Sequence, residues 1–63
     1  MLEHRLLARV ENHIAWVRAQ MAQTGWSLRR ALLDLDFIVP QVRDSVAARK
    51  ALEEFREQLV REN

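Results

Sequence analysis

Apolar residues recur at helical spacing along the first third of the chain. Five of them follow one another at intervals of three and four residues, which places them on one face of a helix: Leu7, Val10, Ile14, Val17 and Met21. No glycine or proline interrupts this stretch, and Gly25, the only glycine, suits the position just after a helix C-terminus. The pattern predicts a long helix over about residues 2–23.

A shorter amphipathic segment follows Gly25. Ser27 is suited to be its N-cap, and Trp26 stands just before that cap. One face of the segment is apolar, formed by Leu28, Ala31, Leu32 and Leu35. Asp34 and Asp36 would oppose the negative end of a helix dipole. The segment is therefore predicted to be a short helix over about residues 27–35.

The only proline, Pro40, marks the next predicted helix. Proline is favoured in the first turn of a helix, where its missing N–H has no helical partner to lose. The pattern predicts a helix over about residues 40–61. Its buried stripe is predicted to contain Val42, Val46, Ala48, Leu52, Phe55 and Leu59.

These elements predict a single all-α domain, residues 1–63, with helices in the order long, short, long. The two long helices are predicted to be antiparallel, with the short one packed across them through Trp26, Leu28, Leu32, Leu35 and Phe37. A chain of this length buries only about 60% of its unfolded surface. Because a short central helix leaves the long helices partly uncovered, we expect dimerisation to complete the fold.

Composition narrows the remaining possibilities. Cysteine is absent, which excludes disulfides and thiolate metal sites. The net charge is +1, although the first 33 residues carry more basic than acidic side chains and the last 30 the reverse. No apolar run approaches the roughly 20 residues that span a bilayer, and the N-terminus lacks the apolar core of a signal peptide. A cytoplasmic protein without membrane contact is expected.

The residues needed for catalysis are largely missing. Tyrosine is absent, Lys50 is the only lysine, and one glycine cannot form a phosphate-binding loop. His4 and His13 are nine residues apart and fall on opposite faces of a helix, so they cannot share a metal. We therefore expect no enzyme activity, no metal, no cofactor and no small-molecule substrate.

The leading hypothesis is a regulatory or accessory module that binds a partner protein and a second copy of itself. Its predicted interface consists of the helical seam and the two tryptophans: Leu7, Val10, Ile14, Trp16, Val17, Met21 and Trp26. Trp16 stands beside the seam, which leaves two interpretations. A third helix covers it as part of the core, which is the commoner arrangement, or it is an exposed anchor for a partner.

The alternative hypothesis is a helix-turn-helix regulator that binds DNA through residues 27–50. It takes Asp36–Val39 as the turn and the helix from Pro40 as the recognition helix. Gln41 and Arg43 would face base edges, and Arg29, Arg30, Arg49 and Lys50 would contact phosphates. Three features disfavour this hypothesis: the turn has no glycine, Asp44 lies beside Arg43, and the convergent basic groups are few.

Overall fold

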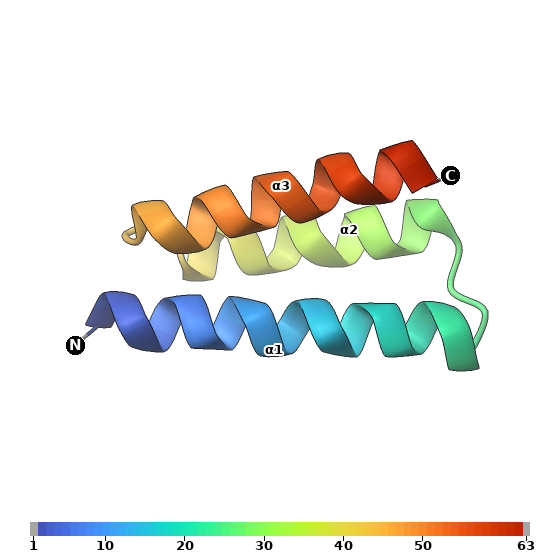
Figure 1. Ribbon diagram of the computed structural model, residues 1–63, viewed down its shortest axis with the longest axis horizontal. Coiled ribbons are helices and arrows are strands. Elements are labelled where there is room, and N and C mark those ends of the chain that lie inside the picture. The colour runs from blue at the N-terminus through green and yellow to red at the C-terminus, as the bar shows by residue number, and fades with distance from the viewer. Residues whose placement is uncertain (1, 63) are drawn as a thin grey trace.

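The computed structural model describes residues 2–62, with side chains from His4 to Glu62. Three α-helices form one bundle, α1 (Leu2–Gln23), α2 (Leu28–Ile38) and α3 (Val46–Glu62), and a short 3₁₀ turn (Val39–Gln41) follows α2. The long–short–long order predicted from the pattern is confirmed (Figure 1). The bundle is 35 Å long and 19 by 16 Å across, so α1, about 33 Å long at 1.5 Å per residue, sets its length.

The direction of the long helices differs from the prediction. They run in the same direction, and each is antiparallel to α2 (Figure 1). Side-chain contacts show this too: Arg18 of α1 meets Glu62 near the end of α3, whereas His13 meets Asp34 and Trp16 meets Trp26 of the α2 segment. The reason is that α2 and the segment after it are together long enough to carry the chain back to the end of the bundle where α1 begins. The short helix is thus a third member of the bundle and not a cap over two antiparallel helices.

The end of α1 follows the glycine signal. Gly25 has φ +73°, in the left-handed region that favours glycine. The N–H groups of Thr24 and Trp26 both donate to the carbonyl of Gln20, at 2.9 and 3.5 Å, which satisfies a free carbonyl of the last turn. Gly25 therefore ends α1 and turns the chain toward α2.

We expect Gly25→Ala to lower the free energy of unfolding by about 1 kcal/mol, the cost of placing an L-residue in the left-handed region. A Cβ at this position would meet no atom within 4 Å, so the loss comes from the backbone alone. Urea unfolding followed by circular dichroism measures it. Gly25→Asn is the control, and it should lose less because asparagine tolerates positive φ. Equal losses for the two variants would contradict this explanation.

The start of α2 was predicted correctly and its end was not. The Ser27 hydroxyl accepts a hydrogen bond from the N–H of Arg30 at 3.1 Å, which confirms the N-cap. The helix then continues past Asp34 and Asp36 to Ile38. Both carboxylates have partners on other helices: Asp34 contacts the imidazole of His13, and Asp36 is ion-paired with Arg56, which offsets its repulsion from the helix dipole. The burial of Ile38 provides a further reason for the helix to continue.

Helix α3 begins at Val46, six residues after the predicted start at Pro40. Pro40 lies instead in the 3₁₀ turn, where its fixed φ and missing N–H are equally well tolerated. The N-cap is Ser45, whose hydroxyl accepts a hydrogen bond from the N–H of Ala48 at 3.1 Å. The prediction failed because it took Pro40 as the only start signal and did not consider the Ser45 hydroxyl as an N-cap.

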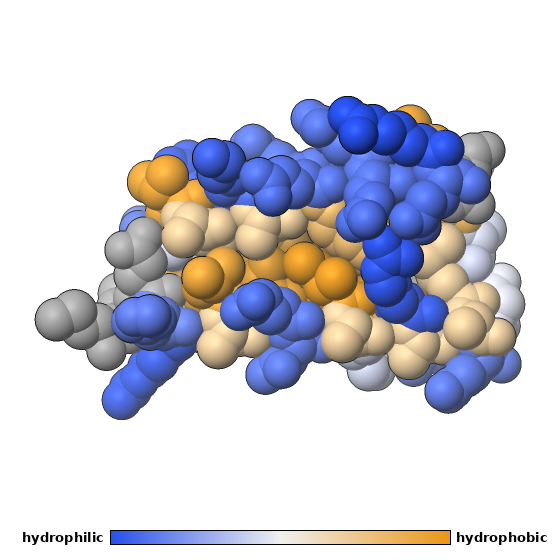
Figure 2. Space-filling view, viewed as in Figure 1, coloured by the Kyte–Doolittle hydropathy of each residue, from blue (hydrophilic) through white to orange (hydrophobic). Residues whose placement is uncertain are grey.

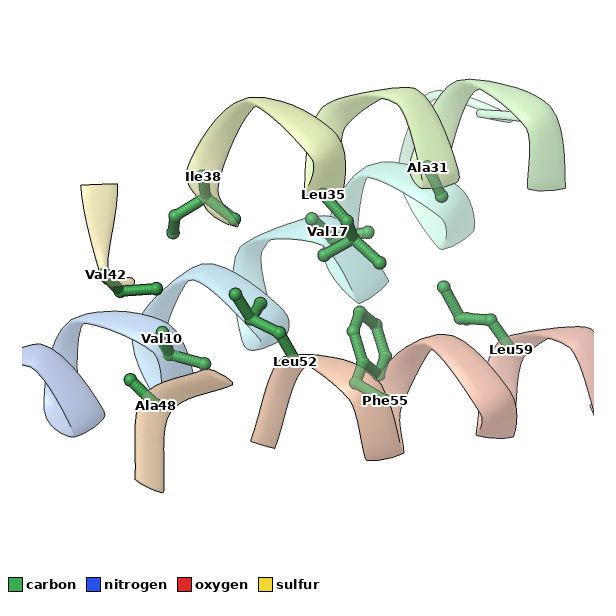
Figure 3. Packing of buried hydrophobic residues seen from close by; sticks show 10 residues of the cluster. All are labelled: Val10, Val17, Ala31, Leu35, Ile38, Val42, Ala48, Leu52, Phe55 and Leu59. Carbon is green, nitrogen blue, oxygen red and sulfur yellow. The ribbon is translucent and has the colours of Figure 1, made fainter. Parts of the chain in front are cut away.

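All three helices contribute to the core, which closes within a single chain (Figure 3). The buried apolar residues are Val10, Val17, Ala31, Leu35, Ile38, Val42, Ala48, Leu52, Phe55 and Leu59. This confirms the predicted α3 stripe from Ala48 to Leu59, together with Val42. Val46 is 66% exposed, contrary to the prediction, because it is the first residue of α3 and not an interior position of a longer helix.

Candidate functional site

The predicted interface residues of α1 differ in how far they are buried. Val10 and Val17 are fully buried in the core, so no partner reaches them in this fold. Leu7, Ile14 and Met21 are half-buried. Ile14 and Ala51 line a shallow hollow between α1 and α3. Both side chains also pack against the core. Figure 2 shows a hydrophobic band on this side of the bundle.

Trp16 lies at the surface, with 46% of its area exposed. Its ring meets the half-buried ring of Trp26 edge to face, with the centroids 5.2 Å apart. On its other side the ring of His13 lies 5.4 Å away, and the guanidinium of Arg30 lies over Trp26 at 5.0 Å. Of the two interpretations of Trp16, the structure excludes a fully covered core residue. The aromatic contacts hold the exposed ring in place.

Polar side chains link α1 to α2 beside these aromatics. The imidazole Nε2 of His13 contacts a carboxylate oxygen of Asp34, and both side chains are about three-quarters buried. One turn further along the bundle, the guanidinium of Arg9 donates to the side-chain oxygen of Gln41. An open groove of about 450 Å³ lies between these links, lined by Arg9, Asn12, His13, Asp34, Phe37, Ile38 and Gln41.

Two large apolar side chains are exposed on α2, and one of them, Phe37, lines this groove. Phe37 is 76% exposed and Leu33 is 51% exposed, and their spacing of four residues places them on the same face of the helix. Phe37 was predicted to be buried. Because α2 continues through residue 37, the helical register directs Ile38 to the core and Phe37 outward. We call the surface formed by Trp16, Trp26, Leu33, Phe37 and the groove the α1/α2 face.

The residues proposed to contact DNA do not form one compact group. Arg29 and Arg30 lie at the start of α2, whereas Gln41, Arg43, Arg49 and Lys50 lie toward the opposite end of the bundle (Figure 1). Helices α2 and α3 run alongside each other, unlike the crossed pair of a helix-turn-helix unit. The side chain of Gln41 already contacts Arg9 and donates to the carbonyl of Phe37 at 3.3 Å.

DNA binding stays a prediction. Titration with duplex DNA at two salt concentrations tests it, because phosphate contacts weaken steeply as salt rises.

Other classes of site find little support in the part of the chain that is described. Among residues 2–62, no three histidine, aspartate or glutamate side chains gather as a metal site would require. Over the same residues, no helix combines the length and apolarity needed to cross a bilayer.

Comparison with known proteins yields no relative: no family model matches the sequence, and no curated protein or solved structure matches significantly. Function must therefore be argued from the α1/α2 face itself.

Sequence reasoning found part of this face. Trp16 and Trp26 were named because tryptophan is frequent at interfaces, whereas Phe37 was assigned to the core. One further signal was available in the sequence. Between Glu11 and Arg29 the only formally charged side chain is Arg18, so the outer side of α1 around Trp16 is almost uncharged. A charge-poor exposed helix face is typical of a surface that another molecule covers.

Proposed function

We propose that this chain is a small helical interaction module that acts by binding protein surfaces, including a second copy of itself. The observation that carries the proposal is the exposure of Trp16, Leu33 and Phe37 on the α1/α2 face of a 63-residue chain. Adjacent exposed apolar side chains of this size are typical of interaction sites. They are also costly to leave in water when no partner covers them.

Trp16 is suited to be the anchor of such an interface. Its contacts with His13 and Trp26 restrict the ring before binding, which reduces the entropy lost when a partner covers it. Tryptophan is also the residue most often found at binding hot spots. A rigid, half-exposed indole thus supplies apolar area at a low conformational cost.

The outer side of α1 around Trp16 supports self-association. Asn12, Ala15 and Gln23 are exposed there, Ala19 is half-buried, and none carries a charge. In an antiparallel pair of α1 helices related by a twofold axis, Trp16 of one chain would lie opposite Ala19 of the other. Asn12 would lie opposite Gln23. A large side chain would thus face a small one, and a side-chain amide would face another amide. No like charges would face each other.

We expect Trp16→Ala to weaken homodimerisation at least about thirtyfold, as loss of a hot-spot residue does. Helicity should remain nearly unchanged, because the side chain is half-exposed. Light scattering after gel filtration over a concentration series measures the oligomeric state, and circular dichroism measures helicity. Val60→Ala is the matched control, since Val60 is similarly exposed but lies on α3.

Each outcome decides a different part of the proposal. A wild-type protein that stays monomeric at its highest soluble concentration would contradict self-association. Equal weakening by Trp16→Ala and Val60→Ala would remove Trp16 as the anchor. Loss of helicity in Trp16→Ala alone would show that the indole supports the fold and not the interface.

A further inference from the structure

The outer side of α2 combines apolar and cationic groups. Leu33 and Phe37 occupy its exposed centre. Arg29 and Arg30 lie in the first turn of the same helix, and Arg9 lies across the groove on α1. A surface with a hydrophobic centre and a charged rim is the usual construction of a protein-binding site.

The charges on this side of the bundle are unbalanced. Both carboxylates of α2 are already used within the chain, Asp34 with His13 and Asp36 with Arg56 at 2.8 Å. Among the described side chains, Arg9, Arg29 and Arg30 form no ion pair. Arg9 contacts a neutral amide, and Arg30 lies over the ring of Trp26. This side of the bundle therefore carries three arginines without an ion-pair partner, while its one groove-lining carboxylate, Asp34, already contacts His13.

We propose that the outer side of α2 binds an acidic, amphipathic helix of a partner protein. The proposal rests on the interaction function above but not on self-association. The apolar stripe of such a helix would cover Leu33 and Phe37 and place a side chain in the groove of about 450 Å³ beside Phe37. Its flanking carboxylates would meet Arg9 on one side and Arg29 and Arg30 on the other, as charge-assisted hydrogen bonds.

A polypeptide suits this surface better than nucleic acid does. Two large apolar side chains, Leu33 and Phe37, are exposed on the same helix as Arg29 and Arg30, and a phosphate backbone offers no apolar group to cover them. Affinity for nucleic acid comes mainly from neutralised phosphates, and three cations supply little of it. An amphipathic helix matches both features at once, because its apolar stripe and its acidic flanks lie at fixed spacing.

The test uses a labelled synthetic helix of about 18 residues, with leucine at i, i+4, i+7 and i+11 and glutamate beside that stripe. Fluorescence anisotropy measures its affinity for the full-length chain. A second peptide carries lysine in place of every glutamate, and a short duplex DNA is the third probe. We expect the acidic peptide to bind at least about tenfold more tightly than the basic one.

Two variants locate the site. Arg29→Glu combined with Arg30→Glu should weaken the acidic peptide at least about tenfold. These changes preserve α2, because acidic residues in a first turn are favoured by the helix dipole. Phe37→Ala should weaken the peptide to a similar degree while leaving the fold intact, since this side chain is exposed. Arg49→Glu, an exposed arginine of α3, is the matched control and should leave affinity within about twofold.

Several results would overturn the inference. They are the absence of acidic-peptide binding, equal binding of both peptides, or equal weakening by Arg49→Glu and the paired α2 reversal. Salt-sensitive DNA binding that all the arginine reversals weaken would favour a nucleic-acid partner instead. Dimerisation measured on the same samples separates the two proposals. Intact, Trp16-dependent dimers without peptide binding would refute this inference and leave the proposed interaction function standing.

Discussion

Phe55→Ala is expected to lower the free energy of unfolding by about 3–5 kcal/mol, the usual cost of removing a buried phenylalanine ring. The ring is 3% exposed and lies among Val17, Leu35 and Leu59 (Figure 3), with the guanidinium of Arg18 5.0 Å from its centre. A domain of this length has a total stability of about 3–9 kcal/mol. The variant should therefore lose about a third or more of its stability, and a domain at the lower end of this range would be largely unfolded without denaturant.

The chain supplies its own control, because the only other phenylalanine is the exposed Phe37. Phe37→Ala should change the free energy of unfolding by no more than about 0.5 kcal/mol. Urea titrations at one fixed protein concentration measure both variants, since dimerisation would make stability depend on concentration. A large loss for Phe37→Ala together with a small one for Phe55→Ala would contradict the burial of the two rings described above.

The contrast between these two rings shows what the sequence could reveal. Helix-period spacing identified Phe55 correctly, because it belongs to a stripe that repeats through Ala48, Leu52 and Leu59. Phe37 stands next to Ile38 near a predicted helix end, where either residue could face the core. Because large apolar residues are usually buried, Phe37 was assigned to it. Only the continuation of α2 to Ile38 fixes the register that exposes Phe37.

Helix direction could not be predicted for a related reason. Local pattern predicts that a helix forms but not how far the chain travels before the next one begins. Ending α2 at Leu35 and starting α3 at Pro40 made the middle segment short, so it was treated as a cap packed across two antiparallel long helices. In the structure α2 continues to Ile38 and a 3₁₀ turn and a short loop follow, so the chain returns along the bundle before α3 begins at Val46.

The contacts of Asp34 and Asp36 connect the fold to the proposed site. Asp34 contacts His13 of α1 and Asp36 pairs with Arg56 of α3, whereas Arg29 and Arg30 form no ion pair among the described side chains and lie on the same helix as the exposed Leu33 and Phe37. The charge excess in the first half of the sequence was visible from composition, but its location was not. Folding brings Arg9 of α1 to the groove beside Phe37, 28 positions further along the chain.

Ser45→Ala is expected to lower the free energy of unfolding by about 2 kcal/mol, near the upper end for loss of an N-cap. Ser45 is 2% exposed, and its hydroxyl accepts the hydrogen bond from the N–H of Ala48 at 3.1 Å. Ala48 is itself buried, so water cannot readily replace the lost acceptor, and an unpaired buried donor adds to the cost. For a domain of this size the melting temperature should fall by roughly 8–16 °C.

Ser27→Ala is the matched comparison, since Ser27 also caps a helix through a 3.1 Å hydrogen bond but is exposed. Water can replace its hydroxyl, so we expect a loss of about 1 kcal/mol or less. Thermal unfolding of the two variants side by side measures the difference. If Ser45→Ala were neutral, α3 would not depend on a cap at Ser45, and a start at Pro40 would regain support. Equal losses at the two caps would instead show that burial does not increase the cost, because the hydrogen bonds have the same length.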